Sequence, residues 1–189
     1  PLGTPRKADL RRHLSETYTA IGNHALAVRE AKAAIRVAPK NAENYRRLGD
    51  AHAAVGKVIP ALKSYERALQ FDPSSASLRR VLAQQSMVAG DFRRAVGLYR
   101  KIVELDRRDV EAQYELANAL EHAGDREQAL TAYQATLALD PRRFDTLVAM
   151  GRLYREKREY EVALNTLQKA VAVNDRVPAA FEELGSVYT

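Results

Sequence analysis

The sequence of 189 residues contains no cysteine. Disulfide bonds and thiolate metal ligands are therefore excluded, and nothing in the composition favours an oxidising compartment. No apolar run approaches the roughly 18 residues that a membrane-spanning helix needs. The first residues are polar and basic, which is not typical of a secretory signal peptide. We therefore expect a cytoplasmic protein without a membrane span.

Residues that carry catalysis or bind metal ions are also few. The four histidines are scattered along the chain: His13, His24, His52 and His122. No two of them have the spacing of zinc ligands beside a carboxylate. Gly56-Lys57 lacks the spacing of a phosphate-binding loop, and no serine lies in the strand–turn–helix elbow of a nucleophile. We predict that the chain is not an enzyme and needs no cofactor or metal ion.

What the sequence does contain is a strict period. Five alanines follow one another at intervals of 34 residues: Ala27, Ala61, Ala95, Ala129 and Ala163. An apolar column keeps the same step: Leu14, Leu48, Leu82, Leu116 and Met150. A fixed period of this length indicates a repeat array, in which each unit buries its apolar face only against its neighbours. We expect five tandem units, at residues 8–41, 42–75, 76–109, 110–143 and 144–177.

The second unit predicts two helices joined by a turn. Asn41 is expected to cap the first helix and Gly56 to end it, because glycine tolerates the positive φ found there. Pro73 cannot continue the second helix. His52 occupies an apolar position and is expected to be a packed, hydrogen-bonded core residue. A column of small residues faces the alanine column and allows the helices to approach closely: Gly49, Ala83, Ala117, Gly151 and Gly185. Each unit is therefore a helical hairpin, and the fold class is all-α.

This unit resembles a tetratricopeptide repeat (TPR) through Tyr45, Leu48, Gly49, Gly56, Ala61, Tyr65, Ala68 and Pro73. The resemblance covers nearly the whole chain. It implies a right-handed α-solenoid, a superhelix whose first helices line a concave groove. The departures from this pattern are local. Arg11 stands at the position of Tyr45, which suits a first helix with no preceding repeat, and Arg158 replaces the turn glycine, which implies a less tightly specified turn. Ala31 replaces the second tyrosine, and Arg107 and Asp175 replace the proline.

The two ends depart from the repeat pattern. We expect residues 1–7 to be a tag remnant and linker. Residues 178–189 match only a first helix, so they are interpreted as a truncated sixth repeat or a C-terminal cap. The face from Phe181 to Thr189 is then open to self-association with a second copy.

The resemblance places one residue column of the first helices in the groove. In the first three units this column holds Arg12, Arg46 and Arg80. The planar arginine guanidinium binds carboxylates and carbonyl oxygens through N–H groups in a fixed geometry, which favours a binding role. The alternative is local pairing four residues on, where Arg46 meets Asp50. Arg80 is the strongest candidate because Gln84, not an acid, stands at that place.

The fourth unit presents a different groove surface. Glu111, Glu115 and Glu121 surround Tyr114 and Asn118, which predicts an acidic patch with an aromatic anchor, unless the face is simply solvated. Met87 of the preceding unit is expected to add an apolar pocket. The complete predicted groove surface is Arg12, Arg46, Asp50, Arg80, Gln84, Met87, Tyr114, Asn118, Glu121 and Arg152.

These features favour a non-catalytic scaffold or adaptor that binds a peptide or a partner protein in its groove. Two alternatives remain open: the targeting or substrate-recruiting arm of a larger enzyme, and a self-assembling, homo-oligomeric scaffold. Nucleic acid is not expected as a partner. The net charge of +6 comes from 30 basic residues interleaved with 24 acidic ones, and the basic stretch of the third unit lacks aromatic residues spaced for base stacking.

Overall fold

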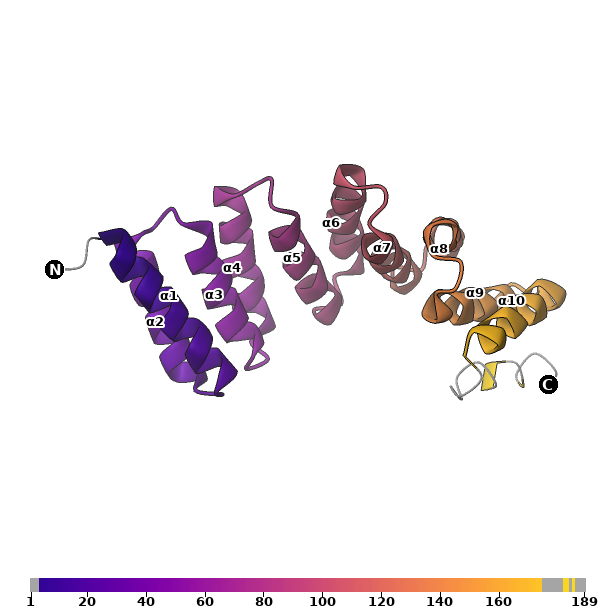
Figure 1. Ribbon diagram of the computed structural model, residues 1–189, viewed down its shortest axis with the longest axis horizontal. Coiled ribbons are helices and arrows are strands. Elements are labelled where there is room, and N and C mark those ends of the chain that lie inside the picture. Colours follow the sequence, from indigo (N-terminus) through magenta and orange to yellow (C-terminus); the bar gives the residue numbers. More distant parts are fainter. Residues whose placement is uncertain (1–3, 175–181, 184, 186–189) are drawn as a thin grey trace. The chain divides into compact units, whose positions relative to one another are not determined.

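The computed structural model describes residues 4–174, 182–183 and 185. Its helices are α1 (Thr4–Ala20), α2 (His24–Val37), α3 (Ala42–Ala53), α4 (Val58–Phe71), α5 (Ala76–Val88), α6 (Phe92–Leu105), α7 (Val110–His122), α8 (Arg126–Leu139), α9 (Phe144–Glu156) and α10 (Tyr160–Val173) (Figure 1). No strand occurs in this part of the chain, so the expected all-α class is confirmed. Residues 4–7, assigned above to a leading linker, belong to α1. The C-terminal segment proposed for self-association lies almost entirely outside the described residues.

The chain divides into two compact units, residues 1–98 and 99–189, and the division falls within α6. In the first unit α1 packs against α2, α3 packs against α4, and consecutive hairpins meet through α2 with α3 and α4 with α5. In the second unit α7 pairs with α8 and α9 with α10, and α8 joins the two hairpins by packing on α9. Each unit is therefore built from antiparallel helix pairs in which neighbours in sequence are neighbours in space.

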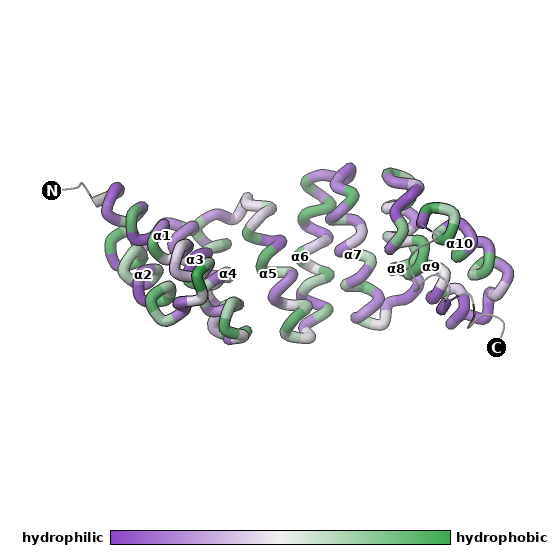
Figure 2. The backbone as a smooth tube through the Cα atoms, turned by 60° about the horizontal axis from the view of Figure 1, so that its bottom comes forward, coloured by the Kyte–Doolittle hydropathy of each residue, from purple (hydrophilic) through white to green (hydrophobic). Residues whose placement is uncertain are grey.

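The periodic alanines form the centre of the packing. None of the five has any accessible surface: Ala27, Ala61, Ala95, Ala129 and Ala163. A single methyl group at each site lets two helix backbones come close while leaving no void. The apolar positions recur at helical spacing, so hydrophobic and hydrophilic stretches alternate along each tube in Figure 2.

Two glycines of the small-residue column, Gly49 and Gly151, are packed against the second helix of their own hairpins. A Cβ atom added to Gly49 would lie 2.5 Å from Cε1 of Tyr65, and one added to Gly151 would lie 2.5 Å from Cδ2 of Leu167. Tyr65 follows the periodic Ala61 by four residues, and Leu167 follows Ala163 by the same interval. Glycine at these two sites is therefore required by contact with a bulky side chain, and not by the backbone conformation.

Caps and turns follow the sequence in most repeats. The Asn41 side chain accepts a hydrogen bond from the Asn44 amide at 3.3 Å, as expected of an N-cap. Four turn glycines have positive φ: Gly22, Gly56, Gly90 and Gly124. In the fifth repeat Arg158 takes the same conformation, with φ of 63°, and it is the single non-glycine residue with positive φ in the described chain. Its Cβ atom makes this conformation unfavourable.

Replacing Arg158 with glycine should therefore stabilise the protein by about 1 kcal/mol, because strain in the left-handed region is removed. Equilibrium unfolding in urea would measure the change. The matched variant is Gly124→Ala, which should destabilise by a similar amount, because no neighbouring atom lies within 4 Å of the added Cβ and only φ is at issue. A destabilised Arg158→Gly variant would show that the arginine side chain contributes more than its backbone strain costs.

Candidate functional site

A cavity of about 390 Å³ opens between α7, α8 and α9 of the second unit. It brings together four of the predicted groove residues: Tyr114, Asn118, Glu121 and Arg152. Phe144 and Val148, both on α9, supply an apolar wall. A cavity that combines polar groups with an apolar wall is typical of ligand-binding sites.

Tyr114 is held in place by its neighbours. The Arg143 guanidinium lies over its ring, 4.3 Å from the centroid, and the Tyr133 ring is 5.9 Å away, centroid to centroid. Burial raises the pKa of the Tyr114 phenol, and the nearby Asp145 carboxylate raises it further. Tyr114 is therefore a neutral, pre-positioned aromatic group at neutral pH.

The acidic groups of the fourth unit are mostly neutralised. Glu111 Oε2 lies 2.7 Å from Arg143 Nη2, and Glu121 forms an ion pair with Arg152. Glu121 also accepts a hydrogen bond of 2.8 Å from the Tyr133 hydroxyl. Although burial opposes its charge, Arg152 has a pKa above the ordinary value because of Glu121. The expected acidic patch is thus a paired surface, since Arg143 at the N-cap of α9 and Arg152 on α9 both reach these carboxylates.

Asn118 has one atom whose bonding capacity is unused. Its Oδ1 is buried and has no hydrogen-bond partner among the described residues. A hydrogen bond from the same side chain to Tyr114 acts to lower the pKa of that phenol, so the amide group is oriented beside the ring. A buried acceptor without a donor is uncommon in native structures, and it is explained when a ligand N–H or a water supplies the donor.

The predicted arginines of the first unit are paired differently from the expectation. Arg12 Nη1 lies 2.9 Å from Asp9, three residues earlier, and Arg46 Nη1 lies 3.7 Å from Glu43. Asp50 accepts hydrogen bonds from Tyr65, at 2.8 Å, and from Arg47, at 3.4 Å. The alternative of local pairing is therefore met by Glu43 in the preceding turn of the helix, and not by Asp50.

Arg80, Gln84 and Met87 also lie in the first unit. Arg80 and Gln84 each interact with another group of the protein, so the missing acid at position 84 does not leave Arg80 unpartnered. Met87 is half-buried on α5. The ten predicted residues are therefore distributed over both units, and only the four around the second-unit cavity share one pocket.

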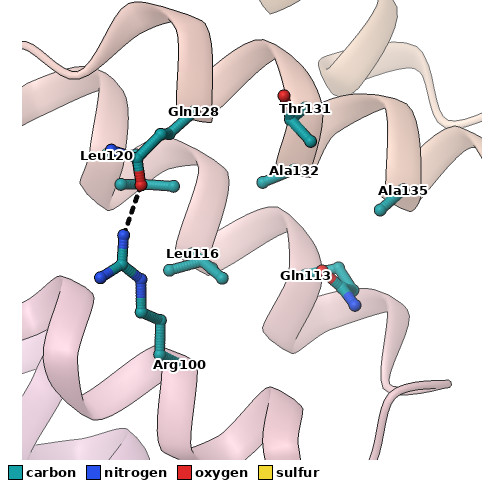
Figure 3. A pocket seen from close by; sticks show the side chains of 8 residues that line it. All are labelled: Arg100, Gln113, Leu116, Leu120, Gln128, Thr131, Ala132 and Ala135. Carbon is teal, nitrogen blue, oxygen red and sulfur yellow. Dashed lines mark hydrogen bonds between the residues drawn. The ribbon is translucent and has the colours of Figure 1, made fainter.

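A second cavity of about 300 Å³, which the sequence analysis missed, lies among α6, α7 and α8 (Figure 3). Leu116, Leu120 and Ala132 form its apolar lining. At its edge Arg100 donates a hydrogen bond of 2.5 Å to Gln128 Oε1. The sequence feature that could have predicted this cavity is Ala132, because the corresponding residue of the preceding repeat is the larger Leu98.

The part of the chain that the structure describes holds neither a metal-binding cluster nor a membrane-spanning helix. No group of three or more histidine, aspartate or glutamate side chains is arranged to hold a metal ion. None of the described helices combines the length and the apolarity needed to cross a membrane.

Comparison with known proteins places these observations in a family. Residues 79–186, more than half of the chain, match the family model of the middle TPR-like domain of cilia and flagella-associated protein 70. Residues 14–76 match a tetratricopeptide repeat model. No curated protein matches the sequence.

Solved structures share the fold at low sequence identity. The crystal structure of YrrB, a TPR protein with an unusual peptide-binding site, has a TM-score of 0.80 and 21% identity, covering 91% of this chain and 89% of YrrB. The crystal structure of MamA has a TM-score of 0.82 and 20% identity, covering 94% and 97% of the two chains. MamA from Desulfovibrio magneticus RS-1 has a TM-score of 0.81 and 21% identity, covering 89% and 96%. With helical hairpins repeated every 34 residues and family models matched along both halves, this chain belongs to the tetratricopeptide repeat family.

Proposed function

We propose that the protein is a non-catalytic interaction scaffold that binds an extended segment of a partner protein, with the α7–α9 cavity as the main anchoring site. The observation that carries the proposal is the buried, unpartnered Asn118 Oδ1 beside the pre-positioned Tyr114 ring. An extended peptide supplies a backbone N–H for such an acceptor and a side chain for the neighbouring wall of Phe144 and Val148.

The charges around this cavity indicate what the segment carries. Glu121 and Arg152 neutralise each other, which leaves Asp145 as the remaining carboxylate among the lining residues. A neutral or basic segment with an apolar or aromatic side chain is therefore favoured over an acidic one. The peptide-binding site named for YrrB is consistent with this use of the fold, although that site belongs to YrrB.

The first unit offers additional contacts. Among the described residues Arg12 is paired with Asp9, whose side chain is 51% exposed, and the buried Nε atom of Arg46 has no partner. Such arginines exchange an exposed intramolecular partner for a carboxylate or carbonyl oxygen at little cost. In our proposal they assist binding, while the cavity of the second unit provides the anchor.

A peptide ligand selected from a displayed random library tests this proposal. Tyr114→Ala should weaken binding of the selected peptide at least about tenfold in fluorescence anisotropy, because a central aromatic anchor is lost. The matched control is Tyr160→Ala, which removes a tyrosine that is 49% exposed on α10 and outside the cavity. Helical circular dichroism should be unchanged in both variants. Equal affinities for the two variants, or a library that yields no peptide, would contradict the proposal.

Two other functions remain alternatives to a free-standing scaffold. A larger enzyme that uses the array as a targeting arm would bind its substrate or partner through the same cavity, so the Tyr114→Ala test applies to it equally. Self-assembly depends on residues that the structure does not describe. Light scattering over a concentration series distinguishes it, since a monomer at all concentrations excludes it.

A further inference from the structure

A third cavity, of about 390 Å³, lies in the first unit between α2, the end of α3 and the turn that precedes α4. All its ionisable lining residues are bases: His24 and Lys32 on α2, His52 on α3, and Lys57 in the turn. No acid lines it. Neither lysine forms an ion pair with a carboxylate in the described part of the chain, so no ion pair compensates the positive charge of the cavity.

Both histidines have an unused nitrogen. The Nδ1 atoms of His24 and His52 are buried and have no hydrogen-bond partner among the described residues. The expectation that His52 is a hydrogen-bonded core residue is therefore not met at this atom. Burial lowers the pKa of His52, and Lys32 and Lys57 lower it further, so the imidazole is neutral at neutral pH. A buried imidazole nitrogen at a cavity wall needs a hydrogen-bond partner, and a ligand bound in the cavity supplies one.

The corresponding place in the second unit is satisfied internally. There Arg126, Gln134, Tyr154 and Glu159 occupy the positions of His24, Lys32, His52 and Lys57. Gln134 donates to the Tyr154 hydroxyl at 3.2 Å, Arg126 pairs with Glu156 at 3.0 Å, and Glu159 pairs with Lys157 at 2.9 Å. This position of the repeat is thus closed by internal bonds between α8 and α9 and left open and basic between α2 and α3.

We propose that the cavity formed by His24, Lys32, His52 and Lys57 binds an oxyanion, either a carboxylate or a phosphate group, whose attached apolar part packs on Val28 and Val55. An oxyanion accepts hydrogen bonds from the imidazole N–H groups and compensates both lysines. Lys57 is also the N-cap of α4 and makes no capping bond with its side chain, so the positive end of that helix adds to the attraction. This site is separate from the peptide-binding cavity, which lies in the other unit.

The test uses the full chain and three probes in an NMR titration of backbone and imidazole signals. Sodium hexanoate supplies a carboxylate with an aliphatic chain, inorganic phosphate supplies the headgroup alone, and 1-hexanol supplies the chain without charge. Hexanoate should cause saturable shifts at His24 and His52, and hexanol should not. If hexanoate binds more tightly than phosphate, the ligand is a carboxylate that carries an apolar chain. If phosphate binds more tightly, the ligand is a phosphate group. Saturable binding of either anion supports the oxyanion site.

Charge reversal at the cavity provides the decisive control. Lys32→Glu combined with Lys57→Glu should weaken binding of the tighter probe at least about tenfold, because two favourable charges become unfavourable. Lys63→Glu changes an exposed lysine on α4 that does not line the cavity, so it should leave the affinity within about twofold. Equal losses in the cavity and control variants, hexanol binding as tight as hexanoate, or no saturable binding of either anion would overturn the proposal. Circular dichroism checks that each variant is folded.

Discussion

Replacing Arg11 with methionine should destabilise the protein by about 3 kcal/mol at neutral pH, the largest loss that we expect from a single substitution. Glu30 on α2 is only 2% exposed, and the Arg11 guanidinium binds its carboxylate. Arg29 also donates to Glu30, at 3.0 and 3.1 Å, but its own side chain is 64% exposed. Without Arg11, a buried carboxylate loses its main partner and keeps the cost of its desolvation.

The loss should depend on pH in a defined direction. The hydrogen bond from Arg11 holds the pKa of Glu30 below its ordinary value of 4.5, against the effect of burial. A lowered pKa in the folded state contributes stability that is complete above the unfolded-state value and is lost as pH falls through the folded-state value. The deficit of Arg11→Met is therefore full at pH 7 and shrinks with falling pH, as Glu30 becomes protonated in the folded state of both proteins.

Two variants separate this explanation from a general loss of charge. Arg12→Met removes the neighbouring arginine, whose partner Asp9 is 51% exposed, and should cost less than about 1 kcal/mol. The double variant Arg11→Met/Glu30→Leu should recover most of the stability, because an apolar pair replaces a buried ion pair. Urea unfolding at pH 7 and at pH 3.5 measures all of them. A pH-independent deficit in Arg11→Met would show that packing, and not the charge of Glu30, accounts for the loss.

Replacing Gly49 with alanine should destabilise the protein by about 2 kcal/mol, although alanine is the better helix former. The added Cβ would lie 2.5 to 2.8 Å from three ring atoms of Tyr65. Tyr65 is 3% exposed and its hydroxyl donates to Asp50, so the ring cannot move away without losing packing or that hydrogen bond. The helices α3 and α4 must then separate.

Gly97→Ala is the matched control. Gly97 lies inside α6, is exposed, and has no neighbouring atom within 4 Å of an added Cβ. The substitution should therefore stabilise the protein by up to about 1 kcal/mol through helix propensity alone. Thermal unfolding of both variants gives the comparison. If the two substitutions changed stability in the same direction, contact with Tyr65 would not be the reason for glycine at position 49.

The sequence predicted the repeating parts of the molecule correctly. Each of the five alanines is fully buried, Asn41 caps α3, and the turn glycines have positive φ, because these features depend on interactions within one hairpin that recur at a fixed spacing. The turn at Arg158 shows that the repeat sets the backbone conformation even without a glycine. The turn keeps the conformation of the glycine turns even where the sequence departs from glycine.

The partners of charged side chains were predicted less well. Local pairing of Arg46 with Asp50 was the alternative to a binding role, but Arg46 pairs with Glu43, while Asp50 accepts a bond from Tyr65 on the next helix. Long side chains reach about one helical turn and also reach neighbouring helices, so spacing along one helix does not decide between local and tertiary partners.

The sequence alone determined the fold class, the hairpin repeat and the membership of the chain in the TPR family, because the 34-residue period repeats one set of local and nearest-neighbour contacts. Tertiary structure decided which residues form a site. It paired Glu121 with Arg152 from the next repeat, left Asn118 Oδ1 unpartnered beside Tyr114, and placed His24 and His52 around one basic cavity. The Glu121–Arg152 pair and the basic cavity join side chains of different repeats, and their formation depends on the reach, charge and burial of each group in three dimensions.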